Sequence, residues 1–132
     1  MDKFTYYLSA SGILTFFLYL IGGFDIALQT LLLCIVLDYI TGLLKAWYEH
    51  NLNSNVGAKG IIKKIGYLIL DVLVTQLDKI AGDTGLIRTP IIYIFVANEG
   101  LSIVENWGRM GMPIPNYLTD RLEQLKNQGG SK

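Results

Sequence analysis

The apolar residues of this chain are gathered into four blocks, and this feature constrains the fold more than any other. The blocks cover residues 8–24, 26–47, 61–80 and 90–108. A helix of about 17 to 25 predominantly apolar residues is long enough to cross a bilayer. Of the 132 residues, 52% are hydrophobic and 17% are charged, whereas charged residues make up roughly 25% of an ordinary soluble domain. The pattern predicts an all-α integral membrane protein with one membrane domain over residues 1–132.

The charges outside the blocks predict the orientation in the membrane. The connection from Lys45 to Lys64 holds four lysines, whereas the other two connections carry no excess of basic residues. The tail over residues 109–132, predicted to form a short amphipathic helix from Asn116, holds four basic residues: Arg109, Arg121, Lys126 and Lys132. Because Lys and Arg accumulate in cytoplasmic loops, four spans with both termini in the cytoplasm are expected. A three-span arrangement, with the first or third block lying in the interface, stays open.

The connection between the second and third blocks is rich in Asn, Gly and Ser. Its sequence, YEHNLNSNVGAKG, covers residues 48–60. Clusters of these residue types between periodic segments are typical of loops. We therefore expect a loop over this range.

Several carboxylates lie inside the apolar blocks. Asp38, Asp71 and Glu99 are the deepest of them. An ionised acid at the centre of a membrane helix costs roughly 2.5 to 3.5 kcal/mol, so three of them facing lipid would cost on the order of 10 kcal/mol. These side chains are expected to face protein, water or a partner.

The polar residues of three blocks fall into stripes at helical spacing. The second block carries Asp38, Gly42 and Lys45, with Glu49 just beyond it. The third carries Lys64, Asp71, Thr75 and Asp78. The fourth carries Asn98, Glu99, Ser102, Glu105 and Asn106, with Arg109 just beyond it. One interpretation is pairing between neighbouring helices, with Glu105 and Arg109 as a local i,i+4 ion pair. The other is a seam that contacts water or joins subunits, and the pattern as a whole favours it.

The basic and aromatic residues near the ends of the blocks predict contact with the inner leaflet. Lysines attract anionic lipid headgroups, and tryptophan side chains favour the interface. The residues expected there are Lys45, Lys59, Lys63, Lys64, Trp47 and Trp107.

Other chemistry is sparse in this sequence. The net charge is zero and no dense Lys/Arg cluster is present, so nucleic acid is not an expected partner. His50 has no ligand-type neighbours at metal spacing, and Cys34 lies inside an apolar run as a packing residue. Neither catalysis nor a cofactor is expected. A metal-dependent membrane enzyme using the polar residues of the fourth block, and a proton-coupled transporter or ion channel, are the alternatives from other classes.

Four segments, in order, resemble a known family of membrane proteins. They read LDYITGLLKAW, LNSNVGAKGIIKK, an intramembrane LD, and ANEGLSIVENWGRMGMPIP. Together they resemble the phage holin family, which includes the toxin-secretion/phage-lysis holins of Gram-positive bacteria and their phages. The resemblance covers residues 31–126, and its most specific part is NE-x-x-S-x-x-EN followed by G-x-P-x-P.

The resemblance implies a small protein that oligomerises in the cytoplasmic membrane and opens timed lesions. Through them an endolysin or a large toxin crosses, and the cell lyses or secretes the toxin. An antiholin, which delays opening, would have a similar sequence. The positions that match the family are Asp38, Thr41, Gly42, Lys45, Ser54, Gly60, Lys64, Asp78, Asn98, Glu99, Ser102, Glu105, Asn106 and Pro113. The family assigns them no catalytic role.

Overall fold

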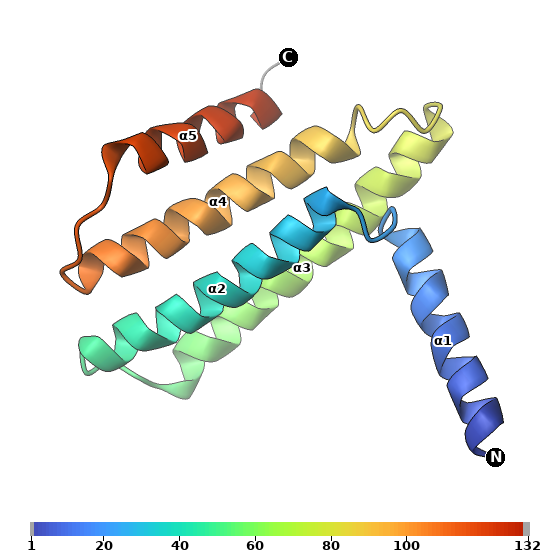
Figure 1. The fold of residues 1–132 in the computed structure, drawn as a ribbon, viewed down its shortest axis with the longest axis horizontal. Coiled ribbons are helices and arrows are strands. Elements are labelled where there is room, and N and C mark those ends of the chain that lie inside the picture. The colour runs from blue at the N-terminus through green and yellow to red at the C-terminus, as the bar shows by residue number, and fades with distance from the viewer. Residues whose placement is uncertain (1, 131–132) are drawn as a thin grey trace.

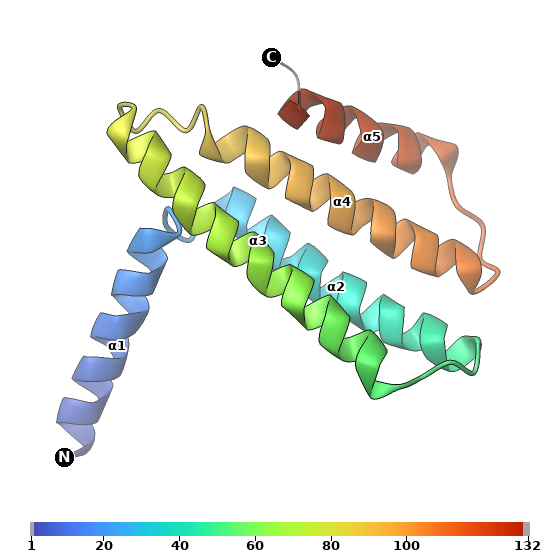
Figure 2. The same cartoon turned by 180° about the vertical axis from the view of Figure 1, so that it is seen from behind.

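The chain is helical almost throughout, as the sequence predicts. The computed structural model describes residues 2–130, and no strand occurs in that range. Its five helices are α1 (Lys3–Leu20), α2 (Ile26–Tyr48), α3 (Ser54–Ile80), α4 (Arg88–Arg109) and α5 (Asn116–Gly130). Helices α2, α3 and α4 lie side by side, α5 returns along α4, and α1 leaves the bundle at an angle (Figures 1 and 2). Lys132, predicted to lie in the cytoplasmic tail, falls outside the described residues.

A glycine turn separates α1 from α2. The first helix ends at Leu20, four residues before the predicted end of the first block, because Gly22 and Gly23 both have φ of +89°. Only glycine adopts this conformation without strain. Asp25 then caps α2, since its carboxylate accepts a hydrogen bond from the Leu28 amide at 3.0 Å.

The loop predicted over residues 48–60 is wrong in its second half. Helix α3 begins at Ser54 and includes Gly57 and Gly60. A Cβ atom at Gly57 would lie 3.3 Å from the Tyr39 hydroxyl, so the glycine lets α3 approach α2 closely. Composition alone indicated a loop, because glycine in a helix is usually unfavourable. The side chain of Ser54 lies outside the described part of the chain.

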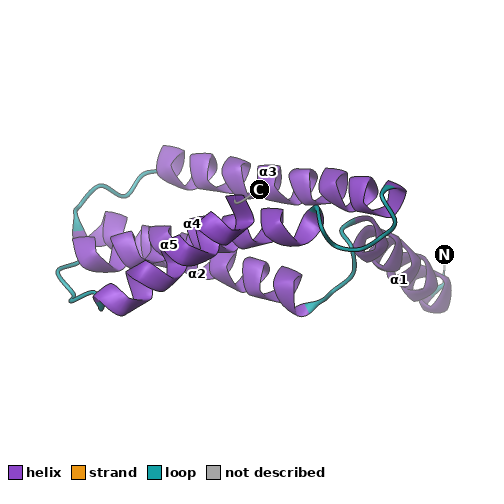
Figure 3. Cartoon of the chain, turned by 90° about the horizontal axis from the view of Figure 1, so that it is seen from above, coloured by secondary structure: helices purple, strands orange, loops and turns teal. Residues whose placement is uncertain are grey.

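Helix α4 lies at the centre of the packing. Its main contacts are with α2 on one side and α5 on the other, and α3 lies beside α2 and α4 (Figure 3). Leu31, Tyr67, Ile92 and Phe95 form the apolar core between α2, α3 and α4. The rings of Tyr67 and Phe95 stack with centroids 4.4 Å apart.

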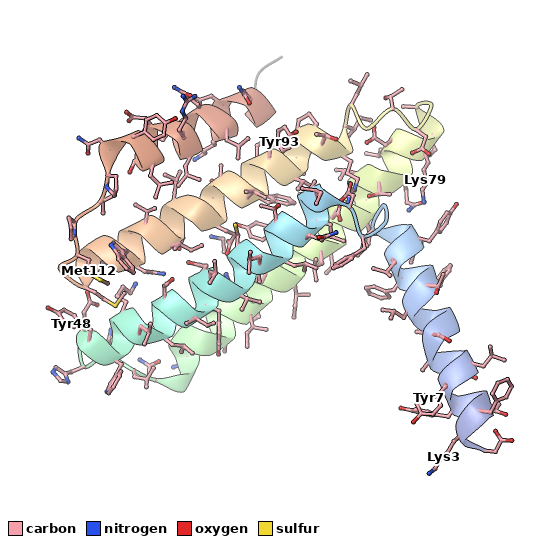
Figure 4. All side chains as sticks on the ribbon, in the orientation of Figure 1. Lys3, Tyr7, Tyr48, Lys79, Tyr93 and Met112 are labelled. Atoms are coloured by element: carbon pink, nitrogen blue, oxygen red, sulfur yellow. The ribbon has the colours of Figure 1, made fainter. Side chains whose placement is uncertain are left out.

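Helix α1 projects away from this bundle. No residue of α1 is buried, and its apolar side chains point in all directions (Figure 4). It is held at its C-terminal end, where Lys79 Nζ donates to the Tyr19 carbonyl at 3.0 Å and Gln76 donates to the Leu20 carbonyl at 3.1 Å.

Within residues 2–130, α2 is the one helix long and apolar enough to span a membrane by length and composition. Its mean hydropathy is 1.9 over the best window. The charged residues of α3 and α4 lower their average hydropathy. Four spans are therefore not confirmed.

Candidate functional site

Three charged side chains from three different helices meet inside the bundle. Lys64 of α3 lies with its Nζ 2.7 Å from Asp38 Oδ2 of α2 and 2.6 Å from Glu99 Oε2 of α4. We call Asp38, Lys64 and Glu99 the Lys64 cluster. Glu99 is fully buried, and the other two side chains are 14% and 11% exposed. The cluster ties α2, α3 and α4 together, because each helix supplies one member.

Asn106 extends the Lys64 cluster toward the end of α4. Its Nδ2 donates to Asp38 Oδ1 at 3.2 Å and to Thr41 Oγ1 at 3.1 Å. Asn106 lies two turns after Glu99, so both project from the same face of α4. Gly42 packs beside this amide, since a Cβ atom there would lie 3.7 Å from Nδ2, at ordinary van der Waals distance.

The Lys64 cluster contains more carboxylate than cation. Two carboxylates share one ammonium group, and Glu99 Oε1 is buried without a hydrogen-bond partner. The buried Tyr67 hydroxyl interacts with the Glu99 carboxylate but makes no hydrogen bond of good geometry. A buried polar atom without a partner costs about 1 to 3 kcal/mol, which offsets part of what the two ion pairs contribute.

A second cluster lies where the α1–α2 turn, the C-terminal part of α3 and the start of α4 meet. The Arg88 guanidinium lies 2.7 Å from Asp25 Oδ2, and its Nε lies 3.2 Å from Asp71 Oδ1. The same Nε donates to the Ile21 carbonyl at 3.1 Å. We call Asp25, Asp71 and Arg88 the Arg88 cluster. Asp71 is fully buried, and its Oδ2 has no partner.

Asp78 caps α4 from a different helix. Its two carboxylate oxygens accept hydrogen bonds from the Ile87 amide at 2.8 Å and the Arg88 amide at 2.7 Å. Ile87, the N-cap residue of α4, supplies no side-chain cap of its own. The buried carboxylate therefore satisfies two of the free amides at the positive end of α4.

Asp25 is the carboxylate of the Arg88 cluster that lies outside the apolar blocks. Burial acts to raise its pKa, but hydrogen bonds from Arg88 and from the Leu28 amide outweigh it. The pKa of Asp25 is therefore held below its ordinary value of 3.8. The carboxylate stays ionised at neutral pH and keeps its bond to Arg88.

An apolar layer separates the two clusters. Lys64 and Asp71 are two turns apart on α3, a rise of about 10 Å, and the core residues Tyr67 and Phe95 lie between the levels of the two clusters. A cavity of about 170 Å³ borders the Lys64 cluster and is lined by Gly42, Gly60 and Ser102, among others. Within residues 2–130, no group of three or more His, Cys, Asp or Glu side chains is placed to hold a metal.

The structure brings together some of the predicted site residues and separates others. The Lys64 cluster and its surroundings contain seven of them: Asp38, Thr41, Gly42, Lys64, Glu99, Ser102 and Asn106. Lys45 lines the adjoining cavity, and Asp71 and Asp78 lie at the other end of the bundle. Asn98, Glu105 and Arg109 belong to neither cluster.

The polar stripe of α4 is therefore divided between two faces. Glu99 and Asn106 face α2 and α3 together with the apolar residues Ile92 and Phe95. Glu105 is 69% exposed and lies 4.0 Å from Arg109, as the i,i+4 spacing predicts. Arg109 also binds Glu49 at the end of α2, at 2.9 Å.

The predicted lipid-facing residues need one correction. Lys64 is buried in its cluster and does not reach the membrane surface. Lys59, Lys63, Trp47 and Trp107 are exposed, as contact with headgroups requires. The indole of Trp107 donates to the Pro113 carbonyl at 3.3 Å, which attaches the G-x-P-x-P segment to α4.

Sequence reasoning missed Asp25, Tyr67 and Arg88 as site residues. Arg88 and Asp25 lie between the apolar blocks, where charges usually face water. The available signal was Asp25 at an N-cap position next to a double glycine, but nothing in the sequence shows that residues 25 and 88 meet.

Within residues 2–130 the bundle defines a class: an all-helical protein whose charged side chains are paired inside it and hold three helices together. The chain belongs to the bacteriophage holin family, whose model matches residues 15–127. Membership supports a holin role at the cytoplasmic membrane.

The relatives come from Gram-positive bacteria and a phage. An uncharacterized 14.9 kDa protein of the nagH 3′ region in Clostridium perfringens is 42% identical over 115 residues, which cover 86% of this chain and 87% of the relative. Protein Lmo0128 of Listeria monocytogenes is 46% identical over 114 residues, or 84% of this chain and 81% of that protein. A "probable holin" of Bacillus phage phi105 is 31% identical over 105 residues, or 80% and 78% of the two chains. No solved structure matches the chain.

Proposed function

We propose that this protein is a holin that oligomerises in the cytoplasmic membrane and opens lesions wide enough for a folded protein. The cargo class is an endolysin or a large toxin. The observation that supports the proposal most strongly is the distribution of side chains, which is the reverse of that in a soluble protein: paired charges lie inside the bundle and large apolar residues lie outside it. Leu33 and Val36 of α2 and Ile62 and Ile69 of α3 are all more than half exposed. Such a surface suits lipid.

The proposed topology has four spans with both termini in the cytoplasm. Helices α1 to α4 contain 18, 23, 27 and 22 residues, which gives lengths of about 27 to 40 Å for a hydrocarbon core of about 30 Å. The Lys-rich connection between α2 and α3 lies at the same end of the bundle as the end of α4 (Figure 1). This arrangement supports a cytoplasmic position for both. A three-span form, with α1 in the interface, is the alternative topology.

The cluster energetics support lesion formation through oligomers. Each cluster holds two carboxylates against one side-chain cation, and each leaves one buried carboxylate oxygen unpaired. Contact with water, or with a second copy, would satisfy these atoms. A monomer in lipid is therefore the state in which these groups are least well satisfied, and assembly into a water-containing structure relieves them.

The test is release of a folded cytoplasmic reporter, of endolysin size, from bacteria after induced expression of the chain. Abrupt release after a lag supports the proposal. Glu99→Gln should shift the lag at matched expression, because Glu99 contributes to the Lys64 cluster, whereas the exposed Glu105→Gln should not. A retained reporter, with the chain confirmed in the membrane, would instead favour an antiholin, or a transporter or channel if ions cross.

A further inference from the structure

Helix α4 carries a second packing face, opposite the one that holds the clusters. At 100° per residue, Ala97 lies about 160° around the helix from Glu99, yet it is fully buried. A row of residues continues from Ala97 along this face with alternating spacings of three and four. We call this row the α4 seam: Pro90, Ile94, Ala97, Leu101, Val104 and Gly108. This spacing is that of a coiled-coil interface.

Helix α5 covers the α4 seam in this structure. It runs antiparallel to α4 (Figure 2), and the contact between these two helices is the most extensive in the fold. A Cβ atom at Gly100, beside the seam, would lie 2.6 Å from a methyl carbon of Leu122, and one at Gly129 would lie 2.6 Å from Ile94 Cγ1. The two backbones therefore approach each other closely.

The opposite face of α5 is charged. Leu118, Leu122, Leu125 and Gly129 repeat with spacings of four, three and four, and Leu122 and Gly129 of this row lie against α4. The residues on the outer face are exposed: Asp120, Arg121, Glu123 and Lys126. If α4 spans the membrane as proposed, a docked α5 would hold these four charges at membrane depth. At roughly 2.5 to 3.5 kcal/mol each, their contact with lipid would cost on the order of 10 kcal/mol.

Undocking of α5 would move its charges from the membrane into water, but it would leave one face of α4 without a partner. Once α5 lies in water, the α4 seam is uncovered, together with Asn98, which flanks it at about 80° from its centre. Asn98 is half-buried in the present structure. Lipid does not satisfy an amide. A second α4 does, because copies inserted in the same orientation place equivalent seams and equivalent Asn98 side chains side by side.

We propose that the α4 seam is the contact surface between the α4 helices of two copies, and that α5 of the same chain blocks it until α4 inserts. This inference rests on the proposed function only in taking α4 as a span. Ala97 and Gly108 let the two backbones approach, as small residues do in membrane helix pairs. Asn98 fixes the register, as a polar residue beside an apolar seam does.

The first experiment maps the seam by cross-linking in membranes. With Cys34 replaced by Ala, single cysteines are introduced by Ala97→Cys in the seam and by Leu33→Cys on the exposed face of α2. Oxidation should produce disulfide-linked dimers at position 97 and not at position 33. Absence of dimers at position 97 in membranes that release a trapped folded reporter would overturn the proposed interface.

The second experiment tests the block by α5. Gly100→Cys with Leu122→Cys, in the Cys34→Ala background, allows a disulfide that locks α5 onto α4, and Leu122→Cys alone is the control that cannot lock. In liposomes, the oxidised double variant should resist cross-linking by a bifunctional amine reagent and retain the reporter. Reductant should restore both dimers and release. Equal dimer formation before and after reduction would overturn the block.

The two readouts separate the inference from the proposed function. If amine-cross-linked dimers form only after unlocking and no reporter leaves in either state, the block stands and the lesion proposal fails. If the reporter leaves equally in the locked and unlocked states, the lesion proposal stands and the block by α5 fails.

Discussion

Replacing Lys64 by Met removes the ammonium group that bridges the carboxylates of Asp38 and Glu99. The two oxygens bonded to Nζ lie 2.7 and 2.6 Å from it, so they cannot be more than about 5 Å apart. At an effective dielectric constant of 20, two negative charges at that distance repel each other by about 3 kcal/mol. Breaking a buried ion pair by removing one partner typically costs 3 to 5 kcal/mol. We expect Lys64→Met to lower the free energy of unfolding by about 3 to 5 kcal/mol.

A compensated variant distinguishes the loss of a charge partner from the loss of packing. Asp38→Asn with Lys64→Met and Glu99→Gln removes all three charges, and it should recover most of the lost stability, because no uncompensated charge remains. Lys63→Met is the control, since Lys63 is exposed on the same helix and surface changes of this kind shift stability by at most about 0.5 kcal/mol. The assay is loss of helical circular dichroism on denaturation in detergent micelles. Equal stability of Lys64→Met and Lys63→Met would refute the reasoning, as would a triple variant no more stable than Lys64→Met.

Three further predictions concern the Arg88 end of the bundle. Gly22→Ala should lower the thermal midpoint more than Gly23→Ala, because both glycines have φ of +89° but only a Cβ at Gly22 would meet Arg88, 2.8 Å from its Cζ; equal losses would argue against that contact. Asp78→Asn should speed hydrogen exchange of the backbone amides at the start of α4 and lower the free energy of unfolding by about 1 to 2 kcal/mol. The reason is that the asparagine side chain has a single acceptor oxygen for the two backbone amides that the carboxylate caps. Unchanged exchange at Ile87 would contradict the cap. Asp25→Asn should lower the free energy of unfolding at neutral pH by under about 1 kcal/mol, as expected of a half-exposed ion pair. Because the folded pKa of Asp25 lies below 3.8, this advantage of the wild type is present above that pH and disappears as the pH falls through the folded pKa; a difference that persists in strong acid would refute it.

The intramembrane charges could be predicted to need partners, but not which partners. Pairing between neighbouring helices is one of the two interpretations of the polar stripes, and Asp38 and Lys64 pair with each other. Helical periodicity gives the face on which a residue lies and does not give the neighbour that this face meets. That is why Glu99 was grouped with Asn98 and Glu105, although it packs with Ile92 and Phe95.

The errors at the helix boundaries have a common physical cause. Gly57 and Gly60 resemble loop residues by propensity, but both lie in α3, and at Gly57 the helix packs closely against Tyr39 of α2. Arg88 was treated as a loop charge because the sequence does not show that the Gly22–Gly23 turn folds back beside it. Both features depend on contacts between distant segments, which local patterns do not encode.

The most direct test of lesion formation uses the purified full-length chain in liposomes. The vesicles contain a small dye and a folded fluorescent protein of endolysin size, and release of both is followed as the amount of protein per vesicle rises. We predict that both cargoes leave together above a threshold amount. Release of the dye alone, at every amount of protein, would contradict the lesion account and indicate a channel for small solutes.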